Sequence, residues 1–270
     1  MTIRRLNNDH EAALEELLQE DPVQNLFLIG FLDANGLGRG HWYGSFAGRG
    51  LRAIVLVLPG RLLVPWARDP ADAADLGTSL VGKHPPSMVV GPREACDAFW
   101  RCWAPKVAPD RHYDQRLYVC RAAAPGTAVG FRRATLQDAP IVAQNAGRME
   151  EEDLGRNPAR TMPEMHAQVV RDRIRNGKTW VLERDGDIVF QINVGTAIPL
   201  GCQVGGTYVP PEHRGRGYGA LGMQELCRQL LPRHAGVTLH VNEANRPAVR
   251  VYEEAGFERH APFRLITVRG

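Results

Sequence analysis

The stretch that decides the fold lies in the last third of the chain and reads Val209-Pro-Pro-Glu-His-Arg-Gly-Arg-Gly-Tyr-Gly219. Residues 203–209 predict a β-strand, because they end in Thr, Tyr and Val, which favour pleated structure. Residues 220–231 carry apolar side chains at helical spacing and precede Pro232, so they predict a helix. A glycine-rich segment therefore joins a strand to a helix.

The three glycines of this segment, Gly215, Gly217 and Gly219, alternate with other residues. Glycine lets the backbone approach a ligand closely, and a helix start offers unpaired N–H groups and the positive end of the helix dipole. Arg214 and Arg216 add fixed positive charge. The segment predicts an anion site, most simply for a pyrophosphate, and the alternative is a glycine-rich turn without a ligand.

Three phosphate-binding patterns compete for this segment. A P-loop requires a Lys after the glycines, and none is present. Gly215, Gly217 and Ala220 satisfy the dinucleotide pattern, and Glu243 lies near the position of its ribose-binding acid. Two observations oppose this second pattern. Five residues, including a Pro-Pro pair, separate Val209 from the first glycine, and only 27 residues follow Glu243, too few for a doubly wound sheet.

The third pattern fits best. Arg214-Gly-Arg-Gly217-Tyr-Gly219 matches Arg/Gln-x-x-Gly-x-Gly/Ala, the coenzyme A pyrophosphate signature of the GNAT superfamily of N-acetyltransferases. Downstream, Leu239-x-Val241-x-x-x-Asn245-x-x-Ala248-x-x-x-Tyr252-x-x-x-Gly256-Phe257 resembles the strand, loop and helix that complete the GNAT cofactor site. The resemblance covers residues from about 129 to the C-terminus. It implies transfer of an acetyl group from acetyl-CoA to a primary amine, of a small molecule or a protein, by direct attack in a ternary complex.

The resemblance also implies roles for individual residues. Backbone N–H groups near Tyr208 and Val209 are expected to bind the thioester oxygen and the pantetheine, and Tyr252 is the expected general acid for the sulfur. Tyr252 as a packing aromatic and Asn245 as a helix cap are the structural alternatives. The expected cofactor contacts are Thr207, Tyr208, Val209, Arg214, Gly215, Arg216, Gly217, Tyr218, Gly219, Asn245 and Tyr252.

The general base is less defined. Many GNAT enzymes place an acid on the cofactor strand, but this strand offers Gln203 and no carboxylate, which indicates a base elsewhere or a water relay. The resemblance puts Glu150, Glu151 and Glu152 beside the acceptor site, where adjacent carboxylates raise one another's pKa and attract a cationic amine. The alternative is a solvated face of a helix. Glu243 is a second candidate for the base.

The chain of 270 residues is long enough for two domains. Its first half predicts a strand, two helices, a run of antiparallel strands and then alternating helix and strand, which is the order of a GNAT domain. Residues 66–70 link a strand to a helix without any glycine, so this half is expected to be a degenerate copy without a pyrophosphate site; an unrelated α/β domain is the alternative. Pro and Gly in residues 122–127 predict the linker.

The predicted fold class is therefore α/β (α+β), with two tandem GNAT-like domains. Each is expected to be a mixed, mostly antiparallel twisted sheet flanked by helices. The predicted boundaries are 1–124 for the degenerate domain and 128–270 for the acetyltransferase domain.

Composition limits the remaining functions. A net charge of +3 without any Lys/Arg-rich block gives no indication of nucleic-acid binding, and no segment resembles a signal peptide or a membrane span. Five scattered cysteines indicate reduced thiols in a cytoplasmic protein, and no metal-ligand spacing is present. A homodimer contact is left open. A non-catalytic acyl-CoA-binding or scaffold protein is the alternative function, which retention of Tyr252 disfavours.

Overall fold

The computed structural model describes residues 1–58, 62–84, 88–125 and 128–268. Contacts divide the chain into unit 1 (Met1–Tyr118, His240–Asn245 and Arg259–Gly270) and unit 2 (Val119–Leu239 and Arg246–Glu258). Both units are discontinuous in sequence. Ser87, at the start of a predicted strand, and Gly126 and Thr127, in the predicted linker, lie outside the described residues. The predicted domain boundaries stay a prediction.

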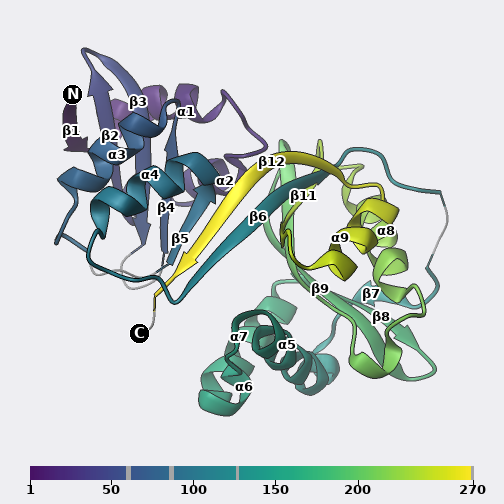
Figure 1. The fold of residues 1–270 in the computed structure, drawn as a ribbon. Coiled ribbons are helices and arrows are strands. Elements are labelled where there is room, and N and C mark those ends of the chain that lie inside the picture. Colours follow the sequence, from purple (N-terminus) through teal and green to yellow (C-terminus); the bar gives the residue numbers. More distant parts are fainter. Residues whose placement is uncertain (59–61, 85–87, 126–127, 269–270) are drawn as a thin grey trace. The chain divides into compact units, whose positions relative to one another are not determined.

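Unit 1 contains a sheet with the strand order β1-β2-β3-β4-β5-β12-β6 (Figure 1). Its elements are β1 (Thr2–Arg5), α1 (Glu11–Leu18), α2 (Leu26–Asn35), β2 (His41–Ala47), β3 (Gly50–Leu58), β4 (Leu62–Ala67), α3 (Pro70–Ser79), β5 (Met88–Pro92), α4 (Arg93–Trp103), β6 (Arg111–Cys120) and β12 (Glu258–Thr267).

Strand β3 forms the centre of unit 1 because both of its faces are buried. Ala53, Val55 and Val57 belong to a core cluster that also contains buried residues of α3 and α4. Successive side chains of a strand point to opposite faces, and the intervening Ile54 and Leu56 are fully buried as well. The near-continuous apolar run of β3 is typical of a strand covered on both sides.

The parallel pair of unit 1 is short. Strands β4 and β5 pair at Leu62↔Met88 and Leu63↔Val89, whereas β1–β2, β2–β3, β3–β4 and β5–β12 are antiparallel. Helix α3 begins immediately after β4, and the Asp69 carboxylate accepts a hydrogen bond of 2.8 Å from the Ala71 amide. The chain's own carboxylate therefore occupies this helix start, as expected for a domain without an anion site.

Unit 2 repeats the arrangement with the strand order β11-β10-β9-β8-β7. Strands β10 and β11 are parallel, and β7–β8, β8–β9 and β9–β10 are antiparallel. Its elements are β7 (Phe131–Arg133), α5 (Ala139–Leu154), α6 (Pro158–Thr161), α7 (Pro163–Arg175), β8 (Thr179–Arg184), β9 (Asp187–Ile198), β10 (Gly201–Tyr208), α8 (Tyr218–Leu230), β11 (Val237–Asn242) and α9 (Arg246–Glu254).

Helices α5 and α8 cover opposite faces of this second sheet (Figure 1). Phe190 of β9 faces α8, where a Cβ placed on Gly222 would lie 2.5 Å from its ring. The next residue, Gln191, points the other way and donates a hydrogen bond of 3.3 Å to the Val142 carbonyl of α5. Gly222 is thus required for close packing of α8 on the sheet.

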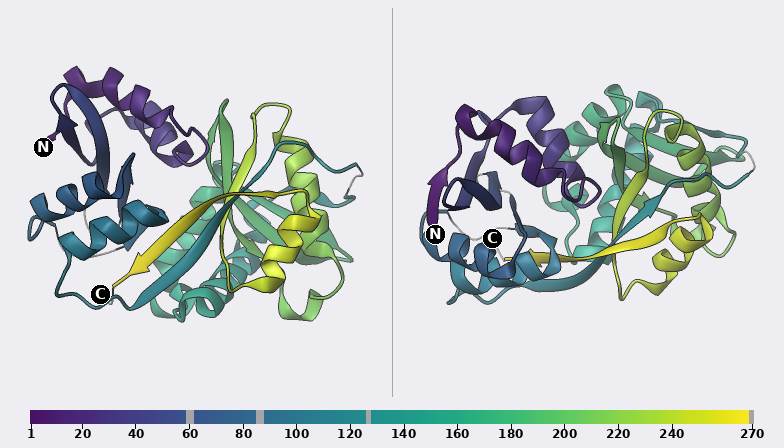
Figure 2. Two further views of the ribbon diagram at one scale, coloured as in Figure 1. Left: turned by 45° about the horizontal axis from the view of Figure 1, so that its top comes forward. Right: turned by 90° about the horizontal axis from the view of Figure 1, so that it is seen from above.

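The last strand of the chain completes the sheet of unit 1. Strand β12 pairs with β5 from Phe263↔Pro92 to Thr267↔Met88, and Ile266 is fully buried in the unit 1 core. Strands β6 and β12, far apart in sequence, run side by side (Figure 2). The C-terminal segment is therefore part of the unit that begins at Met1.

Several local predictions agree with the structure and others do not. The dipeptide Asp185-Gly186 predicts a hairpin turn between two strands, and the hairpin is present, with positive φ at both residues (53° and 87°). The residue type of Thr161 predicts a cap for the helix that ends near Asn176, but this prediction is wrong, because Thr161 is the last residue of α6 and Met162 is the N-cap of α7. Asn157 caps the short α6 by accepting from the Ala159 amide at 3.1 Å. Asn8 and Asp9 are residue types that predict a helix cap before α1, but Asn7 is the N-cap of a short 3-10 helix (Asn8–His10), and His10 is the N-cap of α1.

The apolar residues 117–120 predict a strand that starts at Leu117, but β6 begins six residues earlier, at Arg111. Its first residues are charged or polar, so no apolar alternation marks them as a strand. Arg116 forms an ion pair with Glu243, and Asp114 pairs with Arg264.

None of the described helices combines the length and the apolar character that crossing a membrane requires.

Candidate active site

The cofactor strand predicted from the sequence, β10, contains a bulge near its end. Gly205 is opposite Asn193 of β9, and Tyr208 is opposite Gln191. Between these two pairs β10 therefore has one residue more than β9. Gly206 has a φ of +69°, and a Cβ there would lie 2.6 Å from Asn193 Nδ2. A bulge of this kind bends the strand and interrupts its hydrogen bonds, which frees backbone groups beside Thr207.

The other edge of β10 is also left open. In the described pairings, β10 meets β11 only at Cys202↔Val237 and Gln203↔Thr238, yet β10 continues to Tyr208. Its last residues therefore have no ladder partner in β11. Backbone N–H and C=O groups at such an edge need partners, and an extended ligand with amide groups can supply them.

The glycine loop, defined here as residues 214–219, follows this strand end. Gly215 and Gly217 have φ angles of +74° and +75°, and a Cβ on either would meet no atom within 4 Å. Glycine is thus needed for the backbone conformation, and the space beside both residues is open. Gly217 is the N-cap of α8, and no side chain caps this helix start. The first N–H groups of α8 are available to an anion, in contrast to those of α3, which Asp69 caps.

The two arginines of the glycine loop differ in their surroundings. Arg214 binds both carboxylate oxygens of Glu152 through Nη2, at 2.9 and 2.8 Å, and its Nε donates to the Val209 carbonyl at 3.0 Å. Its guanidinium also lies 5.5 Å from the centre of the Tyr208 ring. Arg216 is exposed, and no carboxylate in the described part of the chain lies within ion-pair distance of it.

The predicted acidic run lies in the last turns of α5, and its members contact different parts of unit 2. Glu152 accepts a hydrogen bond of 3.0 Å from the Tyr208 hydroxyl in addition to its contacts with Arg214. Glu150 pairs with Arg156 at 3.4 Å. Glu151 accepts from Asn157 at 2.9 Å and also pairs with Arg160, and these contacts lower its pKa. Only Glu152 of the three reaches the cofactor strand.

Tyr208 is buried on this strand. Burial raises the pKa of its phenol to about 12, and the hydrogen bond to the charged Glu152 acts in the same direction. Tyr208 therefore remains protonated at neutral pH and acts as a hydrogen-bond donor to Glu152. The contact fixes the end of α5 against β10.

Tyr252, the predicted general acid, is 8% exposed on α9. Burial raises the pKa of its phenol, a hydrogen bond from Thr207 opposes this shift, and the charge of Asp153 adds to it. The net result is a phenol that carries its proton at neutral pH. The structure thus brings together Thr207 and Tyr252, two residues that the sequence assigned to one site.

Asp153 is a residue that the sequence reasoning missed. Partial desolvation raises the pKa of its carboxyl, and the adjacent charge of Glu152 raises it further. Its charge also acts on Tyr252. The signal was available, because Asp153 directly continues the acidic run that ends at Glu152.

Two other predicted residues group with unit 1. The Asn245 amide donates to the Asn242 carbonyl at 2.9 Å, immediately before α9, and its contact with a cofactor stays a prediction. Glu243 pairs with Arg93 at 3.1 Å and with Arg116 at 2.6 Å. Desolvation raises the pKa of Glu243, but the two arginines outweigh this effect and lower it overall. This geometry favours a structural role for Glu243 over that of a base.

A short parallel pair, a bulged strand, an open strand edge and an uncapped glycine-rich helix start together define a class of site. It suits a ligand with amide groups along the strand edge and phosphates at the helix start. In the described part of the chain, no group of three or more His, Cys, Asp or Glu side chains could hold a metal ion.

Comparison with known proteins identifies the family of this site. Residues 147–257 match the Acetyltransferase (GNAT) family, so this part of the chain is a GNAT domain, and the predicted resemblance is confirmed. The Mycothiol acetyltransferase of Thermomonospora curvata is 35% identical over 112 residues, which is 37% of this chain and 36% of that protein. The match thus spans about a third of the length of this curated relative.

Solved structures resemble nearly the whole chain. A GNAT-family acetyltransferase from Colwellia psychrerythraea has a TM-score of 0.61 at 11% identity and covers 100% of both chains. A tandem GNAT protein from the clavulanic acid biosynthesis pathway has a TM-score of 0.56 at 15% identity, over 99% of this chain and 98% of its own. The predicted fold of two tandem GNAT-like domains is confirmed.

Proposed function

We propose that this protein is an acetyl-CoA-dependent N-acetyltransferase that acts on a primary amine. The observation that carries the proposal is the uncapped start of α8 at Gly217. It follows the end of β10, where Thr207 forms a hydrogen bond with Tyr252. The family match of residues 147–257 supports it. A capped helix start such as that of α3 would have no use for a phosphate.

The residues present fit coenzyme A. The N–H groups that follow Gly217, together with the exposed Arg216, would hold the pyrophosphate. Arg214 would contribute a second positive charge to the pyrophosphate site, either while it is paired with Glu152 or after this ion pair breaks. The amides of the pantetheine would pair with the open edge of β10 as far as Tyr208.

The chain's own groups account for the chemistry of acetyl transfer. The amine nitrogen attacks the thioester carbonyl, a C–N bond forms, and the C–S bond breaks. N–H groups freed by the bulge at Gly206 would stabilise the carbonyl oxygen as it gains negative charge. Tyr252 would donate its phenolic proton to the departing sulfur.

The amine must also lose a proton. Glu150, Glu151 and Glu152 remain the predicted groups for this step, and Asp153 joins them because its carboxyl has a raised pKa and its charge reaches Tyr252. Glu152 is already engaged by Tyr208 and Arg214, which suits positioning better than proton transfer. Proton transfer by Asp153, directly or through a water, is the assignment we favour.

Substitution of Tyr252 by Phe tests the enzyme against a protein that only binds acyl-CoA. Release of free thiol from acetyl-CoA would be followed with a panel of primary amines, and binding of acetyl-CoA by calorimetry. We expect kcat to fall about 10²-fold to 10⁴-fold, because a general acid is removed, while the Kd for acetyl-CoA stays unchanged.

The control is Tyr43→Phe, the same chemical change on β2 of unit 1, which should leave both quantities at their wild-type values. Thiol release that is equal in Tyr252→Phe and wild type would exclude Tyr252 as the acid. Tight acetyl-CoA binding without thiol release for any amine would favour the non-catalytic alternative.

A further inference from the structure

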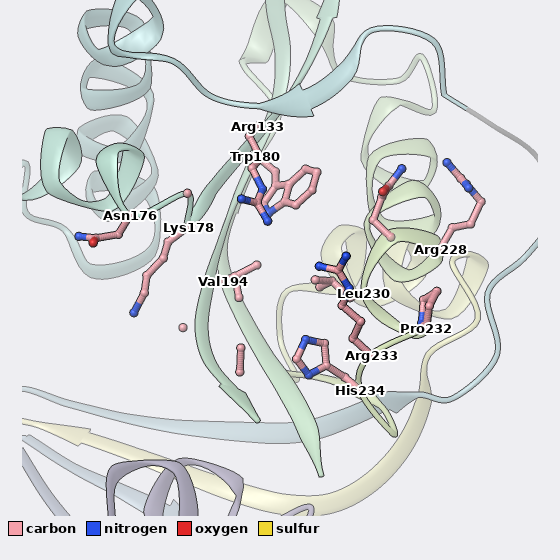
Figure 3. Close-up of a pocket in the computed structure, with 14 residues that line it drawn as sticks. Arg133, Asn176, Lys178, Trp180, Val194, Arg228, Leu230, Pro232, Arg233 and His234 are labelled. Atoms are coloured by element: carbon pink, nitrogen blue, oxygen red, sulfur yellow. The ribbon is translucent and has the colours of Figure 1, made fainter. Parts of the chain in front are cut away.

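A second concave site lies in unit 2, apart from the glycine loop. It is a pocket of about 630 Å³ between the start of β8, the second half of β9 and the end of α8 (Figure 3). We name it the basic pocket after the residues that line it: Arg133, Lys178, Trp180, Arg228, Arg233 and His234.

The basic pocket is separate from the proposed active site. Helix α8 has 13 residues, its first turn adjoins the glycine loop, and its last residue, Leu230, lines the pocket. A rise of 1.5 Å per residue puts the two helix ends roughly 18 Å apart. The pocket also borders the second half of β9, whereas the proposed active site lies at the end of β10.

The lining carries cations and no carboxylate. Arg133, Lys178 and Arg233 have no ion-pair partner among the residues that the structure describes, whereas Arg228 pairs with the buried Glu225. Figure 3 shows Arg233 extending from the end of α8 toward Trp180 and Arg133 on the facing strands. The figure also shows Lys178 extending away from these two arginines. Arg133 and Arg233 are exposed, so water screens their repulsion, and a bound anion would replace that water with charged hydrogen bonds.

The negative ends of the neighbouring helix dipoles do not neutralise the positive charge of the pocket lining. The C-terminal ends of α7 and α8 adjoin the pocket, and each end carries about half a negative charge, or about −1 together. Arg133 and Arg233 together carry +2, so an excess of positive charge remains beside them after the helix ends are counted. An anion would offset this excess and accept hydrogen bonds from the two arginines.

One wall of the basic pocket is aromatic and apolar. The Trp180 ring stacks on Phe131 with their centres 5.4 Å apart, and the Arg133 guanidinium lies 5.1 Å from the Trp180 ring. Val194 and Leu230 add apolar surface. The ring and the guanidinium are therefore held in place before any ligand arrives, which favours a ligand with an apolar or aromatic body beside its charge.

We propose that the basic pocket binds a small organic phosphate independently of acetyl-CoA. A phosphate monoester carries close to two negative charges at neutral pH and accepts hydrogen bonds from two guanidinium groups at once. The volume lies within the range of pockets for small molecules, about 300–1,000 Å³, and a hollow of this size suits a metabolite better than a flat macromolecular surface.

Calorimetry on the full chain tests this proposal. The glycine loop is first saturated with coenzyme A, and the probes are phenyl phosphate, inorganic phosphate and neutral benzyl alcohol. We expect one phenyl phosphate per chain, weaker binding of inorganic phosphate, which lacks the apolar body, and no binding of benzyl alcohol. The double variant Arg133→Gln/Arg233→Gln should weaken binding of phenyl phosphate at least 10-fold, because two charged hydrogen-bond donors are lost.

Matched variants separate this site from the others. Arg173→Gln removes an exposed charge from α7 that does not line the pocket, and it should leave binding of phenyl phosphate unchanged. Arg214→Gln/Arg216→Gln should also leave it unchanged, even in a protein that fails to bind coenzyme A. The proposal is overturned if phenyl phosphate does not bind, if Arg133→Gln/Arg233→Gln binds it as tightly as wild type, or if benzyl alcohol binds equally well.

Discussion

Gly205 and Gly206 are neighbours in β10, but the backbone uses them differently. Gly206 has a φ of +69° and would place a Cβ 2.6 Å from Asn193 Nδ2, whereas Gly205 has an ordinary φ and open space around the position of a Cβ. Asn193 is itself held by Thr179, whose hydroxyl donates to Asn193 Oδ1 at 2.8 Å. The bulge beside the proposed thioester oxygen site therefore depends on glycine at one position only.

Substitution of Gly206 by Ala should lower the free energy of unfolding by about 1–3 kcal/mol, because a non-glycine residue is strained at positive φ and displaces Asn193. Turnover should fall as well, since the backbone N–H groups near Thr207 would shift. Urea unfolding and the thiol-release assay measure the two effects. Gly205→Ala is the matched control, and equal behaviour of the two variants would contradict the role assigned to the bulge.

At the level of single residues, the sequence predicted the glycine loop because its spacing is local. The loop's three glycines and two arginines stand within six positions, and the structure leaves the helix start that follows them uncapped. The pairing of Arg214 with Glu152 was not predicted, because the two residues are 62 positions apart and only packing of α5 against β10 brings them together. Asp153, in contrast, follows Glu152 directly, so its place beside the acidic run could have been read from the sequence.

Strand β7 and the start of α5 are joined by an ion pair. Arg132 binds Asp138 through two hydrogen bonds of 2.7 and 2.9 Å, and Asp138 also accepts from the Thr135 amide at 2.7 Å. The hydrogen bond from Arg132 and these further contacts lower the pKa of Asp138 to about 2, against an ordinary value of 3.8. The carboxylate thus connects two elements of unit 2.

This lowered pKa makes the stability of unit 2 acid-sensitive. Because the folded pKa lies below the unfolded one, the contribution of Asp138 is complete above pH 3.8 and is lost as the pH falls toward 2. We expect Asp138→Asn to lose stability at pH 6 and to show a weaker loss between pH 4 and pH 2 than wild type. Urea unfolding across this range measures both quantities.

The partner variant provides the control for this acid sensitivity. Arg132→Gln removes the main cause of the lowered pKa, so it should also weaken the pH dependence, and the double variant should add little. If the acid sensitivity of all three variants equals that of wild type, the pair does not set it.

At the level of elements, apolar periodicity predicted most helices and strands of both units, and it failed where polar residues form regular structure. The first six residues of β6 are Arg-His-Tyr-Asp-Gln-Arg, in which ion pairs such as Arg116–Glu243 replace apolar contacts. The short α6 was missed because four residues carry no periodicity. Thr161, the expected cap of α7, is the last residue of α6, and Met162 is the N-cap of α7. The basic pocket was not predicted either, because its cations come from separate elements.

The chain as a whole is organised by the return of its C-terminal segment. Ile266 of β12 is fully buried in the core of unit 1 with Val89 of β5 and Leu63 of β4. Sequence order suggested that unit 1 would end with the first half of the chain. The separation in sequence between β5 and β12 explains the difference, because no local pattern indicates which sheet a terminal strand joins.

Ile266→Ala should therefore destabilise unit 1, by about 2–5 kcal/mol, because a buried side chain is removed from its core. Four of the five tryptophans, Trp42, Trp66, Trp100 and Trp103, lie in unit 1, so tryptophan fluorescence reports mainly its unfolding. The control is Ile174→Ala, which removes an equivalent side chain from the core of unit 2. A fluorescence transition unchanged in Ile266→Ala would contradict the place of β12 in unit 1.

We propose that the glycine loop and the open edge of β10 bind acetyl-CoA, and calorimetric titration of the whole protein with acetyl-CoA, and separately with NAD, tests this proposal. We expect one acetyl-CoA per chain and no binding of NAD. Binding of acetyl-CoA should be at least 10-fold weaker in Arg214→Gln/Arg216→Gln, because two charged phosphate contacts are lost. Binding of NAD without binding of acetyl-CoA would contradict it and would favour the dinucleotide pattern in the same residues.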